Sequence, residues 1–66
     1  MIVKINGEPV TLERTMTLSG LVASKGLNSD TIVVEHNMLI VPKCQWHEII
    51  LQEDDRVEIV SFMGGG

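Results

Sequence analysis

The sequence predicts an α+β domain in which one main helix packs across a mixed sheet of four to five strands. Two observations support this prediction. Apolar residues alternate with polar ones near both ends of the chain, which is typical of half-buried strands, and one stretch between them has the spacing of an amphipathic helix. With 66 residues, 44% of them hydrophobic, the chain has material for one small core.

The N-terminal segment is predicted to form a β-hairpin. Apolar and polar residues alternate from Val3, and the alternation resumes at Val10 after a break at Asn6 and Gly7. An Asn-Gly pair favours a two-residue hairpin turn, because both turn positions need a positive φ. Pro9 begins the return strand and donates no hydrogen bond to a ladder, so this strand is expected at a sheet edge.

The helix is predicted to begin after Thr17. Leu18, Leu21 and Val22 fall at positions i, i+3 and i+4, which places them on one stripe of a short helix. Thr17 is a suitable N-cap, and Gly26 is a suitable residue to follow the last turn with a positive φ.

The second half of the chain is predicted to supply three more strands. They are expected at residues 31–36, 39–41 and 57–62, with a loop and one helical turn around Trp46 in residues 43–52 and a turn at 53–55. The element order is then ββαβββ. If the first and last strands are neighbours, they run parallel in the centre of the sheet, because the long chain between them allows a crossover. This is the β-grasp arrangement.

The chain ends in an unusual segment, Met63 followed by Gly64, Gly65 and Gly66. We predict a folded domain over residues 1–63 and a flexible glycine tail over 64–66. A tail without side chains reaches about 10 Å and fits a narrow tunnel in another protein. The α-carboxylate of Gly66 is the one functional group that it presents there, ionised at neutral pH. The alternative is a frayed end without a function.

The whole length of the chain resembles the ThiS family of sulfur carriers. The matching segments are Val33-Val34-Glu35-His36-Asn37, Ile40-Val41-Pro42, Trp46, Asp54-Asp55, Val57-Glu58-Ile59-Val60 and Phe62-Met63-Gly64-Gly65-Gly66. The resemblance implies a ubiquitin-like fold and a carrier rather than an enzyme. It also implies that a ThiF-type adenylyltransferase activates Gly66 with ATP and Mg²⁺, while the chain itself binds no cofactor. A cysteine-desulfurase-linked donor then supplies sulfur, and the resulting thiocarboxylate serves a ThiG-type thiazole synthase in thiamin biosynthesis.

Two alternatives to this function remain open. The small subunit of molybdopterin synthase has the same fold and the same kind of glycine terminus, although residues 33–41 resemble the thiamin-type carrier more closely. A ubiquitin-like interaction module that never carries sulfur is the second alternative.

The last strand suggests a partner surface next to the tail. Side chains alternate across a sheet, so Glu58, Val60 and Phe62 share one face. That face is expected to meet solvent, because burying an unpaired Glu58 costs free energy. Val60, Phe62 and the flexible Met63 are therefore predicted to dock partners. The alternatives are isolated surface hydrophobes or cover by a local loop.

Other reactive residues are predicted to have no functional role. Cys44 has no cysteine partner, and its spacing to His36 and His47 matches no zinc pattern, so we expect no metal site. Trp46 is expected to close one end of the core, with its N–H bound to a carbonyl, rather than to stack on a base. The acidic turn 53–55 is expected to be solvated, with recognition by a basic partner as the alternative.

Composition excludes several classes of protein. A net charge of −4 argues against binding nucleic acid and leaves either a basic protein partner or solubility as its role. A single cysteine indicates a reducing, cytoplasmic location. The N-terminus reads as a strand rather than a signal peptide, and no apolar run is long enough to span a membrane.

Overall fold

A five-stranded sheet organises residues 1–62, which are the residues that the computed structural model describes. Its strand order is β2-β1-β5-β3-β4, with the two strands nearest the chain ends, β1 and β5, parallel at the centre. The predicted α+β class, the element order and the β-grasp arrangement are confirmed. The strands are β1 (Ile2–Ile5), β2 (Glu8–Thr11), β3 (Ile32–His36), β4 (Leu39–Ile40) and β5 (Arg56–Ser61).

The first hairpin forms as the sequence predicts. Asn6 and Gly7 have φ angles of 52° and 83°, so both central turn residues are left-handed, as a tight hairpin between twisted strands requires. Pro9 lies in β2 at the edge of the sheet, where the ladder needs no donor on its open side.

The main helix, α1 (Leu18–Ser24), has both of the predicted caps. The Thr17 hydroxyl accepts a hydrogen bond from the Gly20 N–H at 3.1 Å. After the last turn Gly26 has a φ of 67°, and its N–H and that of Leu27 donate to carbonyls of the helix. This is the C-terminal arrangement that glycine favours, because it carries no Cβ.

Two 3₁₀ helices, η1 (Ser29–Thr31) and η2 (Lys43–Glu48), complete the elements. The helical turn predicted around Trp46 is η2. The predicted bounds of three strands are wrong by about one residue. Thr31 belongs to η1 and not to β3, β4 ends one residue earlier, and β5 covers 56–61 instead of 57–62.

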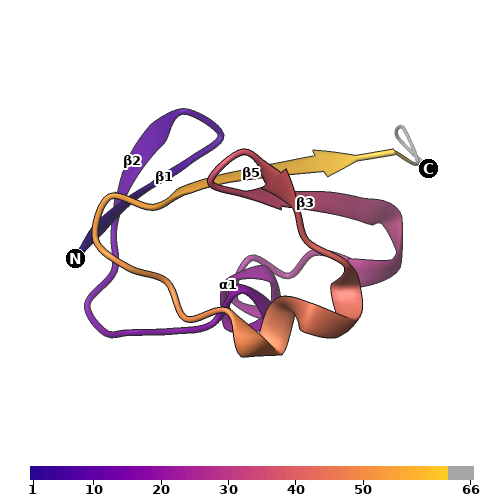
Figure 1. The fold of residues 1–66 in the computed structure, drawn as a ribbon, viewed down its shortest axis with the longest axis horizontal. Helices are drawn as coiled ribbons and strands as arrows, with labels where there is room; N and C mark the ends of the chain where they lie inside the picture. Colours follow the sequence, from indigo (N-terminus) through magenta and orange to yellow (C-terminus); the bar gives the residue numbers. More distant parts are fainter. Residues whose placement is uncertain (63–66) are drawn as a thin grey trace.

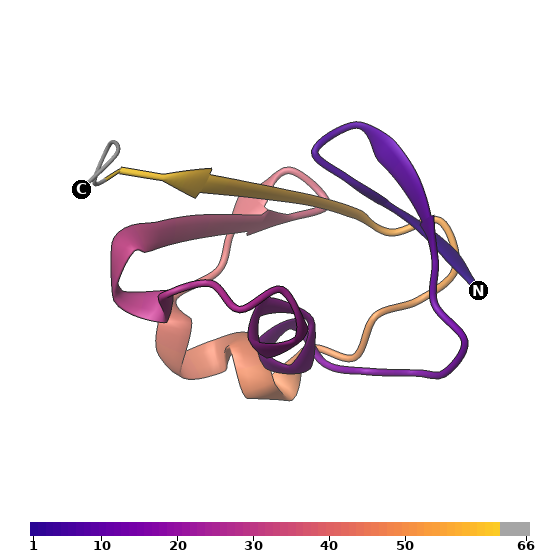
Figure 2. The ribbon, with the colours of Figure 1, turned by 180° about the vertical axis from the view of Figure 1, so that it is seen from behind.

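The helices α1 and η2 lie on the same face of the sheet (Figure 1), and the view from behind shows the same layering (Figure 2). The core fills the space between them and the sheet. None of the helices in residues 1–62 has the length and apolar character needed to cross a membrane. The buried hydrophobic residues are Val3, Ile5, Leu12, Leu18, Leu21, Val22, Ile32, Val34, Val41, Trp46, Leu51 and Val57.

The β3–β4 hairpin has the same turn geometry as the first hairpin, but one of its turn residues is less suited to a positive φ. Its two central residues, Asn37 and Met38, have φ angles of 50° and 77°. Gly7 occupies the second position in the first hairpin, whereas here the position holds a methionine that is 78% exposed. A side chain in this conformation brings its Cβ close to the following carbonyl. Met38 therefore adds strain without the compensation of burial.

Replacing Met38 by glycine is expected to raise the free energy of unfolding by about 1 kcal/mol, because the left-handed conformation then carries no steric penalty. Urea denaturation followed by the fluorescence of the single tryptophan measures the change. The matched control is Gly7→Ala, which has open space around its added Cβ but a φ of 83°, and which should lower stability by a similar amount. If the Met38→Gly variant were less stable than the parent chain, backbone strain at Met38 would be refuted.

Candidate functional site

Backbone hydrogen bonds position the C-terminal end of β5 up to the last described residue. β5 lies between β1 and β3, and its pairing with β3 runs from His36 opposite Val57 to Ile32 opposite Ser61. One residue further, the Phe62 N–H donates to the Thr31 carbonyl at 3.0 Å. The backbone is thus positioned by hydrogen bonds to within four residues of the end of the chain.

A side chain from the first hairpin also holds this end of β5. The Oδ1 atom of Asn6 accepts from the Ile59 N–H at 2.7 Å, and its Nδ2 atom donates to the Ile59 carbonyl at 3.3 Å. Asn6 therefore continues the β1–β5 ladder beyond the end of β1. The sequence marks Asn6 only as a turn residue, because a contact across 53 residues has no local signal.

The outer face of β5, opposite the helices, exposes the predicted apolar residues. Val60 and Phe62 are each 58% exposed, which confirms that this part of the face meets solvent, whereas Val57 on the other face is fully buried. Docking of partners at Val60 and Phe62 remains a prediction. Met63, Gly64, Gly65 and Gly66, which we assigned to docking and to the tail, lie outside the described residues.

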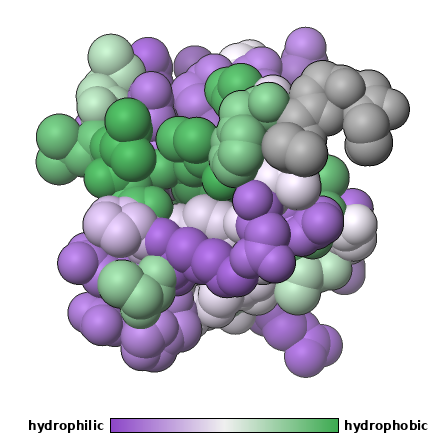
Figure 3. Space-filling model, turned by 90° about the vertical axis from the view of Figure 1, so that its right-hand side faces the viewer, coloured by the Kyte–Doolittle hydropathy of each residue, from purple (hydrophilic) through white to green (hydrophobic). Residues whose placement is uncertain are grey.

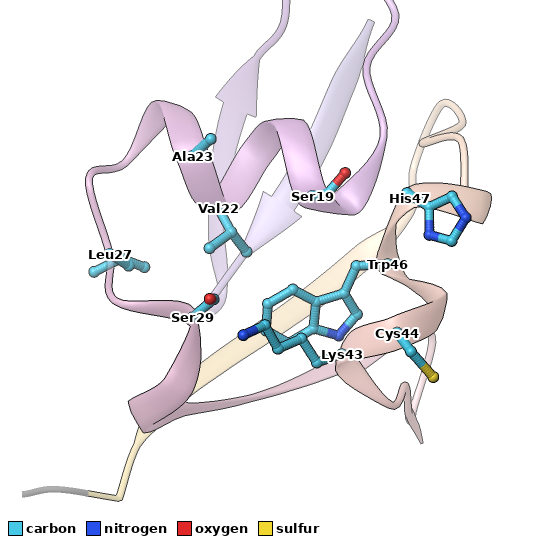
Figure 4. A pocket seen from close by; sticks show the side chains of 9 residues that line it. All are labelled: Ser19, Val22, Ala23, Leu27, Ser29, Lys43, Cys44, Trp46 and His47. Atoms are coloured by element: carbon cyan, nitrogen blue, oxygen red, sulfur yellow. The ribbon is translucent and has the colours of Figure 1, made fainter.

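On the opposite side of the sheet, Trp46 has the structural role predicted for it. Its side chain is buried, and its Nε1–H donates to the Val41 carbonyl at 2.8 Å. The ring borders a hollow of about 590 Å³ between α1 and η2 (Figure 4). Lys43 at its rim is paired with Asp30. The residues around the hollow are Ser19, Val22, Ala23, Leu27, Ser29, Lys43, Cys44, Trp46 and His47.

The reactive side chains that we considered for a metal site are separated by the fold. Cys44 is an exposed free thiol on η2, and its sulfur points away from the Trp46 ring (Figure 4). His47 is exposed beside Glu48, at 3.8 Å, whereas His36 binds Asp55 at 2.8 Å. Within residues 1–62, no group of three or more His, Cys, Asp or Glu side chains is arranged to hold a metal ion.

A family model described as the ThiS family matches residues 3–66. The chain belongs to the ThiS family. This membership favours a thiamin-type carrier over the molybdopterin-synthase type and agrees with the prediction that the chain is a carrier and not an enzyme.

Individual relatives agree with the family assignment. The sulfur carrier protein ThiS of Bacillus subtilis is 39% identical over 64 residues, covering 96% of this chain and 97% of the relative. The crystal structure of the thiamine biosynthesis protein ThiS from Geobacter metallireducens superimposes with a TM-score of 0.86 at 25% identity, covering both chains completely.

A larger relative also matches along the entire chain. A thiazole synthase of Magnetococcus marinus is 39% identical over 66 residues, which is 100% of this ThiS-family chain but only 20% of the synthase. The chain thus spans about one fifth of the length of that relative, and the remainder of the synthase has no counterpart in residues 1–66.

In this ThiS-family chain, the prediction that the turn 53–55 is solvated is wrong for Asp55, whereas Glu53 and Asp54 are exposed. Asp55 is only 8% exposed. Its carboxylate accepts hydrogen bonds from His36 Nε2 at 2.8 Å, from Asn37 Nδ2 at 3.1 Å and from the Gln52 N–H at 2.8 Å. The Glu53 carboxylate accepts from the Ile2 N–H at 3.1 and 3.2 Å. Hydrogen bonds from this turn therefore connect the start of β5 to β1 and to the β3–β4 hairpin.

The hydrogen bonds to Asp55 make this carboxyl a stronger acid. Burial raises its pKa, but the hydrogen bonds from His36, Asn37 and the Gln52 backbone lower it, and the resulting pKa lies below the ordinary value. Since the pKa is lower in the folded than in the unfolded chain, the carboxylate stabilises the fold above the unfolded-state pKa. This stabilisation is lost as the pH falls through the folded-state pKa.

Asp55→Asn is therefore expected to lower the free energy of unfolding by about 1–3 kcal/mol at pH 7, because a buried charged acceptor is lost. The difference between the two proteins should shrink as the pH falls from the ordinary pKa of an aspartate through the lowered folded-state pKa of Asp55, because the parent carboxyl then also becomes neutral. Urea denaturation at a series of pH values measures both effects. A difference that does not shrink anywhere on the acidic side of the titration would show that the charge of Asp55 contributes nothing to stability.

Proposed function

We propose that this chain carries sulfur as a thiocarboxylate on Gly66. A Gly66 carboxylate oxygen attacks the α-phosphorus of ATP, which forms an acyl-adenylate and releases pyrophosphate. A ThiF-type adenylyltransferase supplies the nucleotide site and Mg²⁺, so the carrier binds no cofactor of its own. This need for ATP is consistent with a cytoplasmic location.

Sulfur transfer then proceeds in two steps that balance. The terminal sulfur of a persulfide, supplied through a cysteine desulfurase, attacks the acyl carbon, displaces AMP and forms an acyl disulfide. A thiol attacks the sulfur that belongs to the donor, so that the S–S bond breaks, the donor and thiol form a disulfide, and Gly66 keeps the terminal sulfur as a thiocarboxylate. The carrier contributes only a free carboxylate and a tail that is long enough to bring it into a partner's active site.

The observation that carries the proposal is the run of glycines that follows β5 in the sequence. Hydrogen bonding holds β5 to its end, and the Phe62 N–H is bound to Thr31. The sequence then continues with Met63, Gly64, Gly65 and Gly66. Three glycines extend at most about 10 Å and present no Cβ to a tunnel wall. A rigid domain followed directly by a narrow tail suits delivery of a carboxylate into a partner's active site.

A thiazole synthase is the acceptor that the comparisons favour. A segment similar to this entire chain lies within the Magnetococcus marinus thiazole synthase, where it accounts for 20% of the protein. Joining a carrier to its acceptor in one polypeptide raises their effective concentration, which is useful when the two must meet. We infer that the present chain meets a separate ThiG-type synthase and that this synthase uses its sulfur to form thiazole.

Val60, Phe62 and Met63 are the proposed docking residues for these partners. The exposed Val60 and Phe62 side chains lie on the outer face of the sheet next to the start of the tail. Burying such a side chain contributes about 1.5–3 kcal/mol to association. A partner that binds here also holds the tail at its own active site, which couples docking to the reaction.

Intact mass spectrometry tests the proposal. After incubation with ATP, Mg²⁺, a ThiF-type enzyme and a desulfurase-linked sulfur donor, the chain should gain the mass difference between sulfur and oxygen. Omitting ATP should prevent the gain, and so should deleting Gly66 together with Gly65. A ubiquitin-like interaction module without carrier function would show the same mass under all of these conditions, and that result would refute the proposal.

A further inference from the structure

The outer face of β3, β4 and β5 presents two neighbouring rows of side chains that differ in character. In one row Val33 on β3 is paired with Val60 on β5. In the next, Glu35 lies opposite Glu58 on β5 and opposite Ile40 on β4. Since alternate residues share a face, these rows are adjacent on the same surface.

The two glutamates form a like-charged pair. Residues directly opposite in an antiparallel ladder have Cβ atoms about 4.5–5.5 Å apart, where equal charges destabilise the sheet. Among residues 1–62, neither carboxylate forms an ion pair, and Arg56, two residues before Glu58, also forms none. Within the described domain, no direct ion pair thus relieves the repulsion between Glu35 and Glu58.

Exposed apolar side chains border this pair on two sides, on β4 and in the neighbouring row of β3 and β5. Ile40 is 67% exposed, Val60 and Phe62 are similarly exposed, and Val33 is partly exposed. Figure 3 shows hydrophobic side chains gathered in a band across the upper part of this end of the molecule. A band of this kind on a small domain marks an interaction surface. A charged pair within it becomes desolvated when a partner covers it.

We propose that this surface, formed by Val33, Glu35, Ile40, Glu58 and Val60, docks a thiazole synthase through an apolar patch that carries an arginine or lysine side chain. The basic group lies between the two carboxylates. This inference rests on the proposed function, which supplies the partner, and it adds the charge chemistry that the partner must have. One cation that binds both carboxylates forms charge-assisted hydrogen bonds and relieves their repulsion.

Charge complementarity decides between this occupant and a second copy of the chain. A symmetric dimer through the same surface would bring two further glutamates against Glu35 and Glu58, and each copy has a net charge of −4. Like charges across an interface disfavour association. A basic heterologous partner has the opposite effect, and its binding should weaken as salt screens the attraction.

Titration calorimetry with the thiazole synthase of the same organism, at low and high ionic strength, tests the inference. Glu35→Gln and Glu58→Gln should each weaken binding roughly tenfold or more and reduce its salt dependence, because a desolvated ion pair is broken. The control Glu13→Gln changes an exposed glutamate outside the sheet and should bind like the parent chain. Removing the repulsion should leave the Glu58→Gln fold at least as stable as the parent, which excludes misfolding as the cause.

The outcomes separate this inference from the proposed function. If Phe62→Ala weakens binding while both glutamine variants retain the affinity and salt dependence of the parent, the basic contact is refuted and the carrier function stands. If the parent chain gains sulfur in the mass assay but binds no thiazole synthase at either ionic strength, the partner is wrong and this inference falls with it.

Discussion

A chain extended by one alanine after Gly66 is expected to gain no sulfur when it is incubated with ATP, Mg²⁺, a ThiF-type enzyme and a sulfur donor. The extension leaves the folded domain unchanged but replaces the terminal carboxylate of Gly66 with a peptide bond. An amide oxygen is a much weaker nucleophile toward the α-phosphorus of ATP. The new carboxylate also lies about 3.5 Å further along the chain and carries an adjacent Cβ. Intact mass spectrometry of the parent and extended chains measures the difference.

The control for this prediction is the docking of the extended chain. Its circular dichroism should match that of the parent, and its binding to the adenylyltransferase should persist, because Val60 and Phe62 are unaltered. A second control, Gly64→Ala, keeps the terminal carboxylate and adds one Cβ within the tail, so it should slow the mass gain without abolishing it. An extended chain that acquires sulfur as fast as the parent would refute Gly66 as the modified residue.

Trp46→Ala is expected to destabilise the fold severely, with a melting temperature far below that of the parent. The side chain is 3% exposed and closes the core between η2 and α1. Truncating a buried tryptophan costs about 3–5 kcal/mol. A 66-residue domain has a total stability of roughly 3–10 kcal/mol, so the loss removes a large fraction of it. Circular dichroism during thermal unfolding measures the effect without needing the tryptophan signal.

Trp46→Phe separates packing from hydrogen bonding in this result. Phenylalanine keeps an aromatic ring in the core but cannot donate to the Val41 carbonyl, which Trp46 Nε1 reaches at 2.8 Å. Leaving a buried acceptor without its donor costs about 1–3 kcal/mol. The phenylalanine variant should therefore fold with a lower melting temperature. If the alanine variant melts within a few degrees of the parent, Trp46 does not close the core.

Local signals account for the parts of the fold that could be predicted. Asn6 and Gly7 specify a tight turn by themselves, because their backbone preferences match it. Thr17 and Gly26 mark the ends of α1 for the same kind of reason. Alternation along residues 57–62 was enough to place Val60 and Phe62 on the exposed face. The parallel pairing of the terminal strands also followed, since a long crossover lies between them.

The contacts that could not be predicted join residues far apart in the chain. Asp55 reads as part of a solvated acidic turn until the β3–β4 hairpin brings His36 and Asn37 to it. The left-handed φ of Met38 could not be predicted from the sequence, because methionine is not a residue that favours turns. The opposition of Glu35 and Glu58 depends on the register between β3 and β5, and a shift by one residue would turn one of them to the other face.

The amino-acid sequence by itself determined the element order, the exposed face of the last strand and the glycine terminus of this ThiS-family chain. These features depend on side-chain periodicity and backbone preference, which act over a few residues. Only the tertiary structure decided which polar groups are paired and which charges face each other. Those relations depend on strand register and on the burial of each group, and both exist only after distant segments have packed together.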